Sequence, residues 1–256
     1  MGIGKTAHTK SGGVSGQVSH FHYKIVSEFN VVVTGASRGI GAAVASRFGA
    51  DGARVTICAR TAEDLTSVAE SIRTNGGNVT VVEADVSDVA DVEKVMDAAT
   101  EEADTIDLLV ANAGVYHGTP GETPLRENDY ETFDEHFEIN ARGVFATIRE
   151  GLPSLAPGAR ILVPSGSVAR ESKGGVGSYA VSKAAAEAIV RGFAAELDQT
   201  VTVVDPGQVS TDLMNGATGR DPDEIANMFH WVATAADPNS IDGDVVDLRT
   251  WRTATR

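Results

Sequence analysis

A tyrosine and a lysine stand four positions apart in the segment Tyr179–Lys183. Side chains with this spacing share one face of a helix, so the Tyr179 phenol and the Lys183 amine would point toward one site. A phenol has a pKa of about 10 and is a weak base at neutral pH. A nearby ammonium favours the phenolate and lowers that pKa, which would make Tyr179 an acid/base group. Taken alone, the same spacing is also typical of a solvent-exposed helix face.

A glycine-rich turn occurs much earlier, where an apolar run ends in Thr34-Gly35-Ala36-Ser37-Arg38-Gly39-Ile40-Gly41. Glycines at such a position permit a tight turn, close approach of the backbone to a pyrophosphate, and close packing of helix on strand. The helix that follows would present free N–H groups and a positive dipole end to phosphates. A glycine triplet can serve packing alone, but its place between a strand and a helix favours dinucleotide binding.

The G-x3-G-x-G spacing of this turn resembles that of the short-chain dehydrogenase/reductase superfamily, and further motifs of that family follow in order. The resemblance extends from residue 30 to about residue 250 of the chain. The motifs are Asp85 after the third apolar run, Asn112-Ala113-Gly114 after the fourth, Asn140, Tyr179-x3-Lys183, and Asp205-Pro206-Gly207 with Thr211 after the sixth.

The resemblance implies a catalytic role for three of these residues. Tyr179 would give a proton to a carbonyl oxygen as hydride arrives from a nicotinamide ring. Lys183 would hold the nicotinamide ribose hydroxyls and depress the Tyr179 pKa, with help from the positive charge of the oxidised ring. Asn140 would position a water that links Lys183 to solvent. The alternative for Asn140, a polar side chain that satisfies backbone groups in a helix bend, is compatible with that role.

The family also uses a serine that hydrogen-bonds the substrate oxygen. Its usual interval before the tyrosine falls here on Gly166, which lies between two serines. The run Gly-Ser-Val-Ala matches the family's serine followed by an apolar pair, so we predict Ser167. This choice requires one extra residue at the strand end, where Pro164 would mark a local irregularity. Ser165 is the alternative.

The end of the second apolar run predicts the cofactor. Sites that prefer NAD carry an acidic residue there, whereas this sequence has Ala59 followed by Arg60. Arg38, within the glycine turn, is the other position at which family members contact a 2′-phosphate. Two guanidiniums favour NADP(H), because arginine matches phosphate geometry. NAD(H) remains possible, since Glu63 and Asp64 could draw Arg60 away by pairing.

The other cofactor contacts follow from the resemblance only. They are Gly35, Ser37, Gly39, Ile40 and Gly41 around the pyrophosphate, Asp85 and Val86 at the adenine, Asn112, Ala113 and Gly114 along the cofactor, and Pro206, Gly207, Val209 and Thr211 near the nicotinamide carboxamide and pyrophosphate. No metal site is predicted, because His20 and His22 lack a nearby carboxylate or cysteine.

Apolar runs alternate with amphipathic segments throughout the resembling region. This pattern predicts an α/β fold: a single doubly wound Rossmann domain with a seven-stranded parallel sheet and helices on both faces. The predicted strands are Val31–Thr34, Arg54–Cys58, Val79–Glu83, Ile106–Val110, Arg160–Val163, Val201–Val204 and Val245–Leu248. The predicted helices are Ile40–Ala50, Ala62–Thr74, Val89–Glu102, Tyr130–Leu152, Tyr179–Leu197 and Asp223–Ala235.

Composition limits the class of protein. The chain has 256 residues and a formal charge of −15, which argues against nucleic-acid or anionic-membrane partners. It has no apolar run long enough to span a membrane. Its single cysteine, Cys58, excludes a disulfide framework and favours a reducing, cytoplasmic compartment. Residues 30–256 are predicted to form the domain, and residues 1–29 a disordered or expression-derived leader.

These patterns together predict an NADP(H)-dependent oxidoreductase that interconverts a small carbonyl compound and an alcohol. The alternatives are a 3-oxoacyl thioester reductase, a catalytically silent cofactor-binding sensor, and a methyl-transferring Rossmann enzyme. By family analogy we expect a homo-oligomer, a dimer or tetramer, built through the helices 130–152 and 179–197. Many carboxylates with only six lysines also suggest a source rich in salt, or simply an acidic cytosolic protein.

Overall fold

Runs of valine, isoleucine and leucine form a sheet that is buried on both faces, as a parallel sheet requires. The computed structural model describes residues 24–214 and 218–256 of the chain. The strands are β1 (Asn30–Thr34), β2 (Arg54–Ala59), β3 (Asn78–Glu83), β4 (Ile106–Val110), β5 (Leu155–Pro164), β6 (Thr200–Asp205) and β7 (Val245–Asp247). All are parallel, in the order β3-β2-β1-β4-β5-β6-β7, which confirms the predicted sheet.

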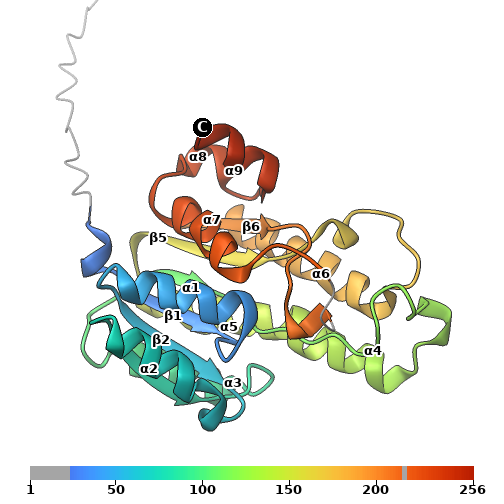
Figure 1. The fold of residues 1–256 in the computed structure, drawn as a ribbon, viewed down its shortest axis with the longest axis horizontal. Coiled ribbons are helices and arrows are strands. Elements are labelled where there is room, and N and C mark those ends of the chain that lie inside the picture. Colours follow the sequence, from blue (N-terminus) through green and yellow to red (C-terminus); the bar gives the residue numbers. More distant parts are fainter. Residues whose placement is uncertain (1–23, 215–217) are drawn as a thin grey trace, which may run out of the picture.

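Helices cover both faces of this sheet (Figure 1). They are α1 (Gly39–Ala50), α2 (Thr66–Thr74), α3 (Val89–Thr100), α4 (Tyr130–Phe137), α5 (Gly143–Gly151), α6 (Gly177–Ala194), α7 (Pro222–Thr234), α8 (Pro238–Ile241) and α9 (Leu248–Ala254). Val31 and Val33 of β1 pack with α1, α2 and α7, whereas the intervening Val32 packs with α3, α5 and α6. The alternation of side chains along a strand thus produces two apolar layers.

The order of the strands determines where a ligand can bind. β1 pairs with β2 on one side and with β4 on the other. The chain therefore builds one half of the sheet outward from β2 and then builds the other half from β4, on the opposite side of β1. In a doubly wound sheet, the loops that follow such neighbouring strands diverge and leave a crevice at the carboxyl ends. The glycine turn after β1 and the Asn112-Ala-Gly114 segment after β4 both lie at this edge.

One predicted helix is interrupted. The sequence predicted a continuous helix over Tyr130–Leu152, but α4 and α5 are separated by a π-helical turn over Glu138–Arg142. A π-helical turn inserts an extra residue into the helix, and such turns often occur at functional sites. Here it contains Asn140, whose side chain forms hydrogen bonds with groups outside its own helix.

Two ends of the domain also differ from the prediction. The last strand stops at Asp247, because the Asp247 carboxylate caps α9 by accepting a hydrogen bond from Thr250 N at 2.7 Å. At the other end, Lys24 pairs with Asp107 at 2.6 Å, and Val26 and Phe29 pack against the core. Residues 24–29 of the expected leader therefore contact the domain, while residues 1–23 lie outside the described residues.

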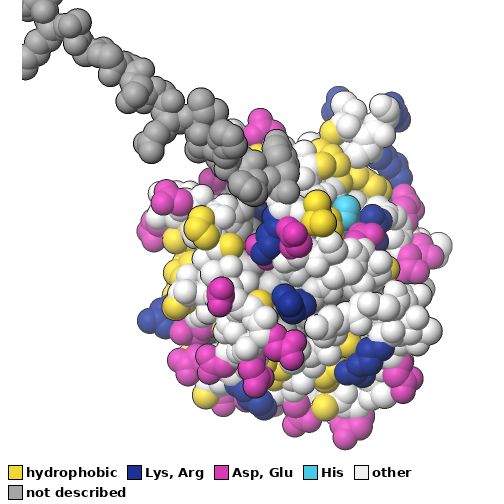
Figure 2. Space-filling model, turned by 90° about the vertical axis from the view of Figure 1, so that its left-hand side faces the viewer, with side chains coloured by type: hydrophobic (Ala, Val, Ile, Leu, Met, Phe, Trp, Pro, Cys, Tyr) yellow, Lys and Arg dark blue, Asp and Glu magenta, His cyan; other side chains and the backbone are white. Residues whose placement is uncertain are grey.

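Charged side chains of both signs are exposed on the surface. Acidic side chains are scattered among basic ones over the face drawn in Figure 2, in line with the 36 acidic and 21 basic residues of the sequence. Within residues 24–214 and 218–256, no helix is long and apolar enough to cross a membrane.

Candidate active site

The glycine turn after β1 is held in place by the segment after β4. The Asn112 side-chain amide donates to the carbonyls of Thr34 and Gly35, both at 2.9 Å. A Cβ on Gly35 would lie 2.6 Å from Ala113 Cα, and one on Gly41 would lie 2.4 Å from Asn112 Nδ2. Gly35 also has a φ of 63°, which disfavours other residues. Both glycines are therefore required for the close approach of these two segments.

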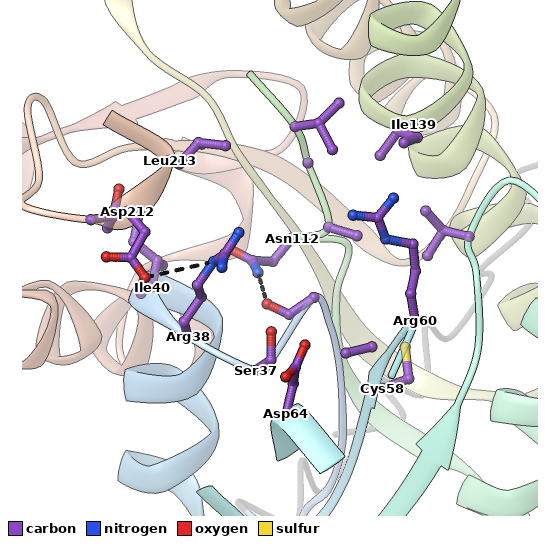
Figure 3. Close-up of a pocket in the computed structure, with 18 of the residues that line it drawn as sticks. Ser37, Arg38, Ile40, Cys58, Arg60, Asp64, Asn112, Ile139, Asp212 and Leu213 are labelled. Atoms are coloured by element: carbon purple, nitrogen blue, oxygen red, sulfur yellow. Dashed lines mark hydrogen bonds and ion pairs between the residues drawn. The ribbon is translucent and has the colours of Figure 1, made fainter. Parts of the chain in front are cut away.

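A cleft of about 420 Å³ opens beside this turn (Figure 3). It runs from the ends of β2 and β3 across the start of α1 to the loop after β4. Helix α1 begins at Gly39 and has no side-chain cap, so its first N–H groups can receive an anion from the cleft. The predicted cofactor residues that line it are Gly35, Ser37, Arg38, Gly39, Ile40, Arg60, Asp85, Val86, Asn112, Ala113, Gly114 and Thr211.

Two arginines, Arg38 and Arg60, line the cleft. Arg38 lies 3.8 Å from the Asp212 carboxylate, with side chains that are 69% and 76% exposed, so this ion pair is weak (Figure 3). Arg60 is exposed and forms no ion pair with any other described residue, so the expected competition from Glu63 and Asp64 is absent there. Both guanidiniums are available to an anion in the cleft.

The Asp-Pro-Gly turn after β6 leads to Thr211, which lines the cleft. Gly207 has a φ of 65°, and its N–H donates to the Asp205 carboxylate at 3.0 Å. Thr211 lines the cleft and approaches the glycine turn, since a Cβ on Gly39 would lie 3.0 Å from Thr211 Cγ2. Of the four residues predicted here, Pro206, Gly207 and Val209 shape the turn and do not line the cleft.

Asn140 joins the loop after β4 to helix α6. It is fully buried, accepts a hydrogen bond from Val115 N at 2.8 Å and donates to Val115 O at 2.9 Å. Its amide also donates to Ser182 Oγ at 3.0 Å, and Ser182 Oγ donates to Tyr179 O at 2.8 Å. The side chain thus satisfies backbone groups at the helix bend and fixes the turn of α6 that carries Tyr179.

The start of α6 is fixed by α4. His136 is buried, its Nε2 accepts a hydrogen bond from His117 N at 3.2 Å, and its Nδ1 lies 2.7 Å from Ser178 Oγ. Since Nε2 accepts, Nδ1 carries the proton and donates to Ser178. Burial lowers the pKa of His136 to about 4, so the ring is neutral at neutral pH. No local pattern in the sequence indicates this contact between α4 and the residue before Tyr179.

Tyr179 is half-buried against aromatic rings. Its ring packs edge-on against Tyr116, with centroids 4.8 Å apart, and Tyr116 itself lines the cleft. Burial raises the pKa of Tyr179 to about 12, with smaller contributions from Tyr116 and the Asp205 carboxylate. The sequence predicted a shift in the other direction, caused by Lys183. Loss of hydration is the largest contribution to the Tyr179 pKa in this structure.

Lys183 is buried one helical turn after Tyr179. Its amine donates to the carbonyl of Pro164, the last residue of β5, at 2.6 Å. Burial lowers the pKa of Lys183 to about 8, and the Glu187 carboxylate opposes this shift. Neither Tyr179 nor Lys183 is among the residues that line the cleft, whereas Tyr116, which packs against the Tyr179 ring, does line it.

The two serine candidates have different partners. Ser165 is buried, and its hydroxyl donates to the Glu187 carboxylate at 2.7 Å. Ser167 is exposed and donates to Glu171 at 3.1 Å, within the short 3₁₀ turn Ser167–Ala169. The structure gives no hydrogen bond between Tyr179 and either serine among the described residues.

The sequence of the chain matches a known protein family. The family described as short chain dehydrogenase matches residues 30–221, which is most of the chain. The chain therefore belongs to the short-chain dehydrogenase/reductase family, whose members are NAD(P)-dependent oxidoreductases.

Individual relatives cover the chain to different extents. It is 37% identical to versicolorin reductase stcU of Emericella nidulans over 191 residues, 71% of this chain and 69% of that protein. It is 33% identical to glycine betaine reductase ATRR of the same organism over 77% of this chain, but it spans only 17% of that protein. A crystal structure of a short chain dehydrogenase from Burkholderia cenocepacia J2315 in complex with NADP has a TM-score of 0.79 and 30% identity. That match covers 88% of this chain and 97% of the other.

Proposed function

We propose that this protein is an NADPH-dependent reductase of ketones or aldehydes that also works in reverse as an alcohol dehydrogenase. The observation that carries the proposal is the position of Tyr179 and Lys183 on one face of α6. The Tyr179 ring packs on Tyr116, which lines the cleft beside the glycine turn. This arrangement supports an acid/base role for Tyr179 near a cleft suited to a dinucleotide.

The residues of the cleft fit such a cofactor. Gly35 and Gly39 line the cleft, and the uncapped start of α1 lies beside them. A bound nicotinamide supplies the hydride. Arg38 and Arg60 are free to hold a 2′-phosphate, which supports NADP(H) over NAD(H), as does the NADP bound to the relative from Burkholderia cenocepacia.

The roles of the chain's own residues follow from their surroundings. The raised pKa of Tyr179 keeps its phenol protonated at neutral pH, which is the state that a proton donor needs. Lys183, held by the Pro164 carbonyl, would bind the ribose hydroxyls and carry a proton toward solvent. Asn140 would support that path from the helix bend. Ser167, or alternatively Ser165, would polarise the carbonyl of the substrate.

The experiment is a screen of NADPH and NADH oxidation with simple carbonyl compounds: nitrobenzaldehyde, cyclohexanone, ethyl acetoacetate and an acetoacetyl thioester. We expect oxidation of NADPH by at least one compound. Faster turnover of the thioester than of its oxygen ester would favour the 3-oxoacyl alternative. Tight NADPH binding with no oxidation by any compound would favour the sensor, and failure to bind NADPH would revive a methyl-transferring enzyme.

We further propose a homo-oligomer. Phe145 of α5 and Val181 of α6 are exposed apolar side chains, and Phe145 stacks on Phe193 with ring centroids 5.7 Å apart. Such a face on two neighbouring helices suits contact with a second copy. Light scattering should give at least twice the monomer mass, and a monomer would contradict the proposal. We also propose a cytoplasmic location, in line with the single buried cysteine, Cys58.

A further inference from the structure

Near Lys183, one arginine is paired with two buried carboxylates. Arg170 follows the 3₁₀ turn after β5, and its guanidinium contacts Glu187 of α6 through Nη1 and Asp205 of β6 through Nη2. The Glu187 side chain is 2% exposed and the Asp205 side chain 8% exposed. Carboxylates removed from water to this extent require a counter-charge, and a forked guanidinium can serve both.

Each carboxylate also contacts a part of the candidate site. Glu187 accepts a hydrogen bond from Ser165 Oγ at 2.7 Å and lies one helical turn after Lys183. Asp205 accepts a hydrogen bond from Gly207 N at 3.0 Å, in the turn after β6. Arg170 therefore connects the serine loop, the helix with Tyr179 and Lys183, and the turn after β6.

We infer that Arg170 is a positioning residue for the reaction: its guanidinium holds these three segments together and compensates the two buried carboxylates beside the Tyr179–Lys183 pair. The inference rests on the proposed acid/base role of Tyr179. Arg170 does not touch the cleft, and it acts through Asp205 and Glu187.

Charge near Tyr179 explains why the compensation matters. Tyr179 is packed against Tyr116 from the loop after β4 and the neutral His136 of α4, and its phenol is close enough to Asp205 of β6 to be affected by that charge. Lys183 lies one turn further along the same helix. Asp205 raises the pKa of Tyr179, and Glu187 raises that of Lys183. Loss of the Arg170 charge would leave the Asp205 charge uncompensated and strengthen its effect on Tyr179, so more alkaline solution would be needed to form the phenolate.

The test is the pH dependence of alcohol oxidation by NADP⁺, measured with the alcohol of the best carbonyl compound from the screen. Arg170→Met should shift the midpoint of the rate profile upward by about one pH unit. Ultraviolet absorbance of tyrosinate in the NADP⁺ complex, read against Tyr179→Phe in the same background, should show the same shift without turnover.

A double variant separates charge from folding. Asp205→Asn keeps an oxygen that can accept from Gly207 N and removes one negative charge, so Arg170→Met with Asp205→Asn should return the midpoint toward its original value. Arg170→Lys keeps the charge but cannot bridge both carboxylates, so it should lower turnover and leave the midpoint in place. Arg126→Met, which removes an exposed arginine paired with Glu127, is the control and should change neither.

An unchanged midpoint in an Arg170→Met protein that still binds NADPH would overturn the inference, as would a shift that Asp205→Asn does not reverse. If Arg170→Met does not fold, a shifted midpoint in Arg170→Lys would overturn it. Failure of the proposed function would give a different result, because Tyr179→Phe would then retain activity with either arginine or methionine at position 170.

Discussion

The arginines of the two halves of the site are held in opposite ways. At the proposed cofactor end, which is the cleft beside the glycine turn, Arg38 and Asp212 are both mostly exposed and 3.8 Å apart, and Arg60 is also exposed and lines the same cleft. At the proposed catalytic end, around Tyr179 and Lys183, Arg170 is paired with two carboxylates that are almost fully buried. The weakly held pair is free to accept a phosphate, whereas the strongly held arginine maintains the position and charge of its neighbours.

The same contrast applies to the rest of the site. The cofactor end is shaped by backbone conformation and by glycines, so side-chain changes there should alter preference more than rate. The catalytic end depends on buried hydrogen bonds between distant segments, such as Asn140 with Val115 and His136 with Ser178. Changes there should alter rate, pH dependence or stability while leaving NADPH affinity nearly intact.

The largest expected effect is that of Tyr179→Phe. Loss of the phenol removes the proposed proton donor, so turnover should fall by at least about 100-fold. The affinity for NADPH, measured by fluorescence titration, should remain close to that of the parent, because Tyr179 does not line the cleft. A variant that retains turnover would remove Tyr179 from the chemistry.

A smaller effect is expected at the cofactor end. Arg38→Ala combined with Arg60→Ala should change the ratio of kcat/KM for NADPH over NADH by at least about tenfold toward NADH, because two charge-assisted contacts to the phosphate are lost. The matched control is Arg73→Ala, an exposed arginine in the last turn of α2. An unchanged ratio in the double variant would place the phosphate elsewhere.

The serines should give a still smaller difference. Ser167→Ala should lower turnover several-fold if its hydroxyl polarises the carbonyl, since one hydrogen bond contributes about 1 kcal/mol. Ser165→Ala leaves the buried Glu187 carboxylate without one donor, so it should lower thermal stability more than Ser167→Ala does. Steady-state kinetics and thermal melts on both variants separate the two roles. Equal turnover in both variants and the parent would exclude either serine.

Acid should lower the stability of the folded protein through protonation of His136. The folded-state pKa of His136, about 4, lies below the usual 6.5, so the unfolded chain binds an extra proton in between. Stability should therefore decrease as the pH falls from 6.5 to about 4, by roughly 5–10 °C in melting temperature. In His136→Asn this part of the decrease should be absent. A slope that is the same in parent and variant would assign it to other groups.

The cofactor end was predictable from the sequence because its signals are local. The glycine spacing after β1 and the arginines at positions 38 and 60 each follow directly from a strand end, and the cleft brings them together as expected. The strand order was likewise predictable, because apolar runs separated by helices allow few alternatives.

The catalytic end was less predictable because it depends on contacts across the fold. Tyr179 and Lys183 were found from their spacing, but neither the pairing of Arg170 with Glu187 and Asp205 nor the upward shift of the Tyr179 pKa follows from a local pattern. One signal was present: Tyr179, Lys183 and Glu187 recur every four residues, which places an acidic group on the same face of the helix.

The central claim is that hydride moves between a nicotinamide bound in the glycine-lined cleft and a carbonyl carbon held near Tyr179. The most direct test uses NADPH that carries deuterium at the transferable position, with the carbonyl compound that turns over best. Mass spectrometry or NMR should find the deuterium on the carbinol carbon of the product. The Tyr179→Phe protein should form this labelled alcohol only at its low residual rate. Product alcohol without deuterium, or oxidised cofactor with no alcohol formed, would contradict the account.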